Sequence, residues 1–127
     1  MNLEGIAAYL ESRRQGTRGT DIFVNEMPAE CEQGMVLRDR YSGTPIDDEL
    51  PGYRDTGFRI AVRSREFAQG KKLANAVFST LYLKTEVQME GMFVKRLVPL
   101  YEPRPYRKSK GGYWEWELDF HIIYVQT

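Results

Sequence analysis

The sequence predicts an α+β domain, in which a mainly antiparallel sheet carries one main helix on a face and a short N-terminal helix beside it. The first observation that predicts this class comes from residues 112–127, where every second residue from Trp114 to Tyr124 is large and apolar. Successive side chains of a strand point to opposite faces, so this period predicts a long strand. The second sign is an apolar face at helical spacing from Phe67 to Leu81, which predicts a helix lying across the tryptophan face of the sheet. Only this helix is placed to act as a crossover, so a doubly wound parallel sheet is not expected.

A short amphipathic helix is predicted at the N-terminus, with Asn2 as its N-cap and an end before Gly16. Its apolar face consists of Leu3, Ile6, Ala7 and Leu10. The main helix is expected to begin near Glu66, and Ser64 stands where its hydroxyl can cap that helix.

Four further strands are predicted ahead of the last one. Alternating or β-branched runs place them at residues 21–25, 35–41, 58–63 and 87–97. Gly91 interrupts the fourth run and is interpreted as a β-bulge. A long loop, Ser42 to Gly52, separates the second and third strands because prolines, glycines and acids are concentrated there. We expect the fourth and last strands to pair as a long antiparallel hairpin, joined by a proline-punctuated stretch and a basic loop, Arg104 to Gly112.

The bulk composition favours one domain spanning residues 1–127 and excludes several classes of protein. The 18 basic and 18 acidic residues cancel, so the chain has no global attraction for nucleic acid or for an anionic membrane. No apolar run is long enough to span a bilayer, and no membrane association is expected. The single cysteine excludes an internal disulfide and fits a reducing compartment.

Enzyme signatures are largely missing from the sequence. His121 is the only histidine, on the polar face of the last strand, where it is either a general base beside Asp119 or simply a residue of the sheet surface. Cys31 lies between two glutamates, whose charges disfavour a reactive thiolate. One histidine and one cysteine cannot form an ordinary zinc site, and no nucleotide-binding or nucleophile-elbow motif occurs. The sequence therefore predicts a protein that is not an enzyme and has no cofactor and no metal.

Charged clusters provide the remaining candidates for a site. The acidic group Asp47, Asp48 and Glu49 could coordinate a divalent ion with Asp39 or Asp55, although loop acids are more often only solvated. The basic loop interleaves cations with tyrosines, as grooves for nucleic acid do, although a hairpin tip is commonly charged for solubility. Its residues are Arg104, Arg107, Lys108 and Lys110, with Tyr101, Tyr106 and Tyr113 among or beside them. A second basic cluster, Arg13, Arg14 and Arg18, is interpreted as a helix end whose cations suit the helix dipole.

Long strands, charged tips and no site chemistry are typical of an assembly subunit. Exposed strand edges favour pairing with a neighbouring chain, and heterologous contacts between copies close into rings. The two long loops project from strand ends and are candidates for axial or lumen-facing contacts. The candidate residues are Asp47, Asp48, Glu49, Arg104, Arg107, Lys108 and Lys110.

The order and spacing of several segments resemble the minor capsid or tail terminator family of tailed bacteriophages over nearly the whole chain. The segments are IFVNEMP (22–28), GMVLRD (34–39), ELPGYRDTGFRIAVRS (49–64), a helix followed by a PLYEP-like stretch (99–103) and the closing DFHIIYV (119–125). No single motif is diagnostic, and the resemblance carries over no catalytic residue.

This resemblance implies an α+β subunit of a hexameric ring at the head-proximal end of a long phage tail. Such a ring stops polymerisation of the tail tube protein and presents a docking surface to the head connector or stopper protein. DNA passes through the lumen without sequence-specific binding. The implied location is the virion, after assembly in the host cytoplasm. Two alternatives stay open, namely another neck component such as a head-closure or adaptor subunit, and a small nucleic-acid-binding module using the basic loop.

Overall fold

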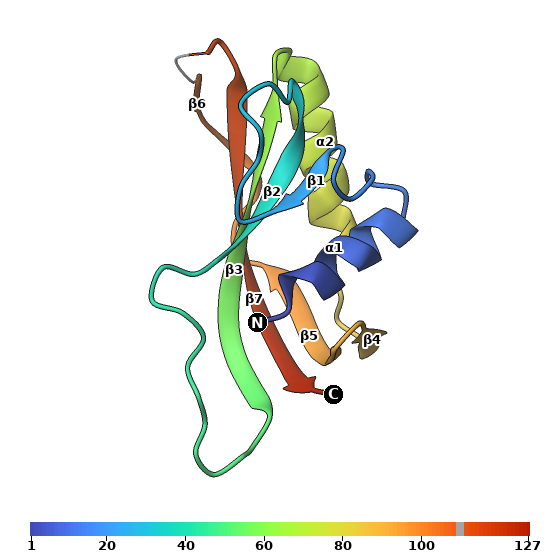
Figure 1. Ribbon diagram of the computed structural model, residues 1–127, viewed down its shortest axis with the longest axis vertical. Helices are drawn as coiled ribbons and strands as arrows, with labels where there is room; N and C mark the ends of the chain where they lie inside the picture. Colours follow the sequence, from blue (N-terminus) through green and yellow to red (C-terminus); the bar gives the residue numbers. More distant parts are fainter. Residues whose placement is uncertain (109–110) are drawn as a thin grey trace.

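A mostly antiparallel, curled sheet with two helices on one side forms the described part of the chain, residues 1–108 and 111–127, in the computed structural model (Figure 1). Only the backbone is described for residues 106–108. The helices are α1 (Leu3–Ser12) and α2 (Phe67–Thr80). The strands are β1 (Ile22–Val24), β2 (Gln33–Asp39), β3 (Tyr53–Ser64), β4 (Val87–Met89), β5 (Met92–Pro99), β6 (Arg104–Lys108) and β7 (Trp114–Gln126). The predicted α+β class is confirmed.

The sheet is organised around β3 and β7, which pair antiparallel from Tyr53 opposite Val125 to Ser64 opposite Trp114. The strand order is β1-β2-β3-β7-β5-β4, and β6 pairs with β7. Within the described chain, only the β1–β2 pair is parallel. The long alternating strand predicted at the end of the chain is therefore confirmed as the centre of the sheet.

The buried face of the sheet is the one that carries the aromatic side chains of β7. From Trp116 to Tyr124, alternate residues of β7 are at most 1 % exposed. Phe120 stacks on Phe58 of β3 with ring centroids 5.1 Å apart. Helix α2 covers the tryptophan end of this face, and its Gly70 lies directly against the Trp116 ring. The prediction that the main helix lies across the tryptophan face is confirmed.

The predicted N-cap of α1 is confirmed, whereas the predicted N-cap of α2 is confirmed only in part. In α1, the Asn2 side-chain oxygen accepts a hydrogen bond from the Gly5 N–H at 3.2 Å, and the predicted apolar face is buried. In α2, the N-cap is Glu66, whose side chain makes no capping bond. The Ser64 hydroxyl accepts a hydrogen bond from the Glu66 N–H at 3.2 Å, so it supports the residue before the helix rather than the helix itself.

Gly91 is part of a turn, and its interpretation as a bulge is wrong. The run predicted as one strand is two, β4 and β5, which pair antiparallel with Met89 opposite Met92. Glu90 and Gly91 form the two-residue connection, and Gly91 has a φ of 77°, a value that glycine adopts without strain. The irregularity of β5 lies further along, at residues 94–96.

The basic segment after β5 is not wholly a loop, which is a second correction. Residues 104–108 form β6, which pairs with β7 opposite residues 114–117, whereas β5 pairs with β7 only opposite residues 120–126. β7 is longer than β5, and β6 supplies hydrogen bonds to the edge that β5 leaves open. Strand β2 begins and ends two residues earlier than predicted, since it runs from Gln33 to Asp39, and Tyr41 is fully exposed.

Candidate assembly surfaces

The two charged segments predicted as contacts lie at opposite ends of the β3–β7 pair. The acidic loop, residues 42–52, leads into Tyr53, which faces Val125, and β6 ends at Lys108, which faces Trp114. At about 3.3 Å per residue, the positions on β7 are about 36 Å apart along the strand. Figure 1 shows the acidic loop at one extreme of the molecule and the end of β6 at the other. The structure therefore separates the acidic candidates from the basic candidates that it describes, those in β6.

Asp47 organises the acidic loop. One of its carboxylate oxygens accepts hydrogen bonds from the N–H groups of Glu49 at 2.9 Å and of Leu50 at 3.1 Å, which closes a local turn. Within the described chain, the carboxylates of Asp48 and Glu49 have no ion-pair partner. No group of three or more His, Cys, Asp or Glu among the described residues is arranged to hold a metal ion.

At the basic end, Arg104 faces carboxylates of its own sheet. Its Nη2 lies 3.3 Å from Oε1 of Glu117 and 3.5 Å from Oδ2 of Asp119, and its guanidinium carbon is 5.4 Å from the centre of the Tyr101 ring. These two acids neutralise the cation, which weakens the expectation that Arg104 faces a phosphate. Arg107 and Lys108 belong to β6, their side chains are not described, and Lys110 lies outside the described residues.

His121 is paired with a different acid from the one that the sequence suggested. Its Nε2 lies 2.6 Å from Oδ1 of Asp55 on β3. Asp119 is held instead by Arg59, with Nε 3.2 Å from Oδ1, and by Arg104. The general-base pairing of His121 with Asp119 is therefore not formed, because each residue's partner comes from a neighbouring strand.

Arg13 and Arg18 of the N-terminal basic cluster, and the cysteine, have local partners. Arg18 donates from its backbone N–H to Glu11 at 2.9 Å and from its guanidinium at 3.1 Å, and these contacts hold the pKa of the Glu11 carboxyl below its ordinary value. Arg13 lies 5.2 Å above the Tyr9 ring. The half-buried Cys31 thiol donates to the backbone carbonyl of Gln33 at 3.4 Å.

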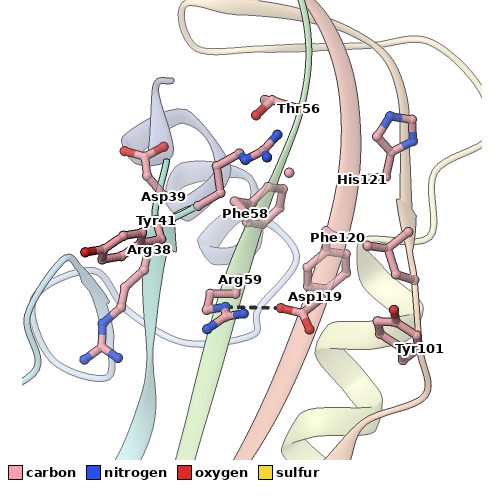
Figure 2. A pocket seen from close by; sticks show the side chains of 13 residues that line it. Arg38, Asp39, Tyr41, Thr56, Phe58, Arg59, Tyr101, Asp119, Phe120 and His121 are labelled. Atoms are coloured by element: carbon pink, nitrogen blue, oxygen red, sulfur yellow. Dashed lines mark hydrogen bonds and ion pairs between the residues drawn. The ribbon is translucent and has the colours of Figure 1, made fainter. Parts of the chain in front are cut away.

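A hollow of about 620 Å³ lies across β3 and β7, and the sequence reasoning did not find it. We call it the outer groove; residues that line it include Arg38, Arg40, Tyr41, Gly57, Arg59, Leu100, Tyr101, Asp119 and His121. Figure 2 shows Arg59 and Asp119 joined across the central strands, between Arg38 and Tyr41 on one side and Tyr101 on the other.

Gly57 is the residue that hollows the outer groove. A Cβ at this position would lie 2.9 Å from the Phe120 carbonyl oxygen, so the position disfavours any larger residue. Without a side chain opposite His121, the sheet surface is open there. An isolated glycine within a strand indicates close approach of another backbone, but the third strand was predicted to begin at residue 58, so Gly57 lay outside it; β3 in fact begins at Tyr53.

Arg38 and Arg40 bring unbalanced positive charge to the outer groove. Within the described part of the chain, neither guanidinium forms an ion pair. Arg38 also stands directly opposite Arg59 in the β2–β3 pairing, and like charges in that position destabilise a sheet. Asp39 also lines the groove, so the three guanidinium groups of Arg38, Arg40 and Arg59 face two carboxylates there, those of Asp39 and Asp119.

Comparison with known proteins defines the class of protein, a structural subunit of a virion. Among solved structures, a chain of "Virion of native gene transfer agent (GTA) particle" shares the fold, with a TM-score of 0.67 and 16 % identity over 97 % of this chain and 96 % of that chain. No curated protein matches the sequence. Residues 9–126 match the family model described as bacteriophage tail terminator protein, and the chain belongs to this family. The resemblance found in the sequence is thus confirmed, and the chain is a structural protein of a phage virion.

No helix in the described part of the chain is both long enough and apolar enough to cross a membrane.

Proposed function

We propose that this protein forms a ring, a hexamer, that caps the head-proximal end of the tail tube, stops tube polymerisation and provides the docking surface for the head connector. Besides membership of the tail terminator family, the observation that carries the proposal is the separation of the acidic loop from the basic end along β3 and β7. A terminator needs one face that matches the tube and another that refuses further tube subunits. Two chemically different ends provide that asymmetry.

The proposed partners are further copies of the chain, the tail tube protein and the connector or stopper protein. The contact residues at the two ends are Asp48 and Glu49 on the acidic loop, shaped by Asp47, and Arg107, Lys108 and Lys110 with Arg104 at the basic end. DNA passes through the lumen without sequence-specific binding. The balance of 18 basic and 18 acidic residues suits that passage, because strong phosphate binding would retard the DNA. The protein acts in the virion, after assembly in the host cytoplasm, without a cofactor or catalytic activity.

Another neck component, a head-closure or adaptor subunit, is the second candidate, since such a subunit also needs two different faces. A nucleic-acid-binding module is less well supported, because Glu117 and Asp119 already neutralise Arg104. The test is a phage that lacks this protein. Overlong tails without heads would support a terminator, whereas free tails of normal length would contradict it and indicate a neck protein that acts later.

The contribution of the basic end is tested by reversing the charges of Arg107 and Lys108 to glutamate. We expect the variant to fold with wild-type stability and to fail in assembly or docking, measured as phage yield and as binding of the purified protein to tail tubes. In a matched control, Lys71 and Lys72 on the exposed side of α2 are replaced by glutamate, which changes the net charge by the same amount. Wild-type phage yield from the β6 variant would remove the basic end from the proposal.

A further inference from the structure

Five of the seven exposed large apolar side chains on the described surface gather at two places, and the other two, Phe67 and Tyr82, lie at the two ends of α2. Tyr41 is fully exposed, Leu100 54 % and Tyr101 59 % exposed, and all three line the outer groove. Ile46 is 74 % and Leu50 53 % exposed, and both belong to the acidic loop. Apolar groups left in water on a rim and on a projecting loop indicate surfaces that are covered in an assembly.

The charges of these two places are complementary. The acidic loop carries three acids and no basic residue, and two of its carboxylates, Asp48 and Glu49, have no ion-pair partner in the described chain. The outer groove has an excess of positive charge, because Arg38, Arg40 and Arg59 line it with only two acids, Asp39 and Asp119, and neither Arg38 nor Arg40 forms an ion pair in the described chain. Asp47 ties its own carboxylate into the turn, which leaves Asp48 and Glu49 at the tip for an outside partner.

We propose that the acidic loop of one copy docks in the outer groove of the next copy. In this contact, Ile46 and Leu50 cover the exposed rings of the groove, and Asp48 and Glu49 pair with Arg38 and Arg40. The occupant is a second copy of this chain, because the loop and the groove match in charge and in apolar content. Since the loop and the groove are different surfaces, the contact is heterologous, the type that closes into a ring.

This inference rests on the proposed ring and names the contact that closes it. It places the acidic loop between neighbouring copies, and the difference between the two faces of the ring then comes from the basic end, which this contact leaves free. Within the isolated chain, Arg59 is paired with Glu117 and Asp119, whereas Arg38, which stands opposite it, forms no ion pair, so a carboxylate from the neighbour would supply the partner that Arg38 lacks.

The test uses two purified variants and their combination, with mass measured by light scattering over a concentration series. The groove variant carries Arg38→Glu and Arg40→Glu, and the loop variant carries Asp48→Lys and Glu49→Lys. We expect each to weaken ring association by roughly 100-fold, because like charges would then meet across the contact. We expect the four substitutions together to restore the rings with their charges exchanged.

Mixing the groove variant with the loop variant gives a sharper result. Between unlike chains, one contact then joins a wild-type loop to a wild-type groove, and the other joins a lysine-bearing loop to a glutamate-bearing groove, so both are complementary in charge. We therefore expect the mixture to recover rings in which the two variants alternate, although each variant alone does not form them. Arg38 also donates to the Asn25 carbonyl at 3.4 Å, so Arg40→Glu alone serves as a second groove variant that leaves this hydrogen bond in place.

The controls are the variant with Lys71 and Lys72 reversed, which should form wild-type rings, and thermal unfolding of every variant. If the wild-type protein forms rings and both variants still form them, the proposed loop–groove contact is contradicted but the proposed ring is not. The same conclusion follows if the loop variant keeps its rings but loses the tail tube, or if the combined variant and the mixture recover nothing. If wild type stays monomeric even with tube protein, the proposed ring fails and this contact fails with it.

Discussion

Gly70→Ala is the substitution that most directly tests the packing of α2 on the sheet. In an exposed helix interior, this change stabilises by about 1 kcal/mol, because alanine loses less backbone entropy than glycine. Here the new Cβ would lie 2.6 Å from Cη2 and 2.9 Å from Cε3 of Trp116, and closer still to Cζ3. The ring is only 1 % exposed and has little room to move. Overpacking of this kind costs about 1–3 kcal/mol, and the overlap with three ring atoms places it near the upper end.

The expected net result is a loss of about 1–2 kcal/mol in the free energy of unfolding, measured by urea denaturation, with a fall in Tm of about 4 °C per kcal/mol. In a Trp116→Leu background the six-membered ring is gone, so Gly70→Ala should become neutral or stabilising. Asn75→Ala on the exposed side of α2 is the matched control and should gain about 0.5 kcal/mol. A gain of about 1 kcal/mol from Gly70→Ala in the wild-type background would refute the close contact.

Three further substitutions test the core and the outer face. Trp116→Ala should cost about 3–5 kcal/mol by denaturation, as truncation of a buried aromatic side chain does, and wild-type stability would contradict its place in the core. Burial raises the pKa of the Tyr124 hydroxyl above its ordinary value of 10.0, so the folded state keeps a proton that the unfolded state releases. Wild-type stability should therefore fall as the pH rises above about 10, whereas Tyr124→Phe should lose this dependence; parallel pH curves for the two proteins would show that the effect arises elsewhere. His121→Ala should alter stability by less than about 1 kcal/mol, because its partner Asp55 is about half exposed; a larger loss in urea denaturation would show that the pair contributes more than its exposure suggests.

The sequence predicted correctly the helices and strands whose periodic pattern of apolar residues lies within the element itself. The alternation from Trp114 to Tyr124 predicted β7 and its buried face, and the helical spacing from Phe67 to Leu81 predicted α2. Asn2 was recognised as the cap of α1 because a cap acts on backbone groups only a few residues away. Gly91 shows the limit of such reasoning, since the same glycine fits a bulge or a two-residue turn, and only the pairing of Met89 with Met92 distinguishes them.

By itself, the sequence determined the fold class, the buried strand at the end of the chain and the likeness to phage tail terminators, because periodicity and segment order are local properties of the chain. Tertiary structure decided that β6 completes the edge of β7, that His121 faces Asp55 and that Gly57 opens the outer groove. It also placed the acidic and basic candidates at opposite ends of one pair of strands. These outcomes depend on which strand edges remain free after the other strands have paired. Local patterns cannot predict them, because the pairing of strands involves residues that are far apart in the chain.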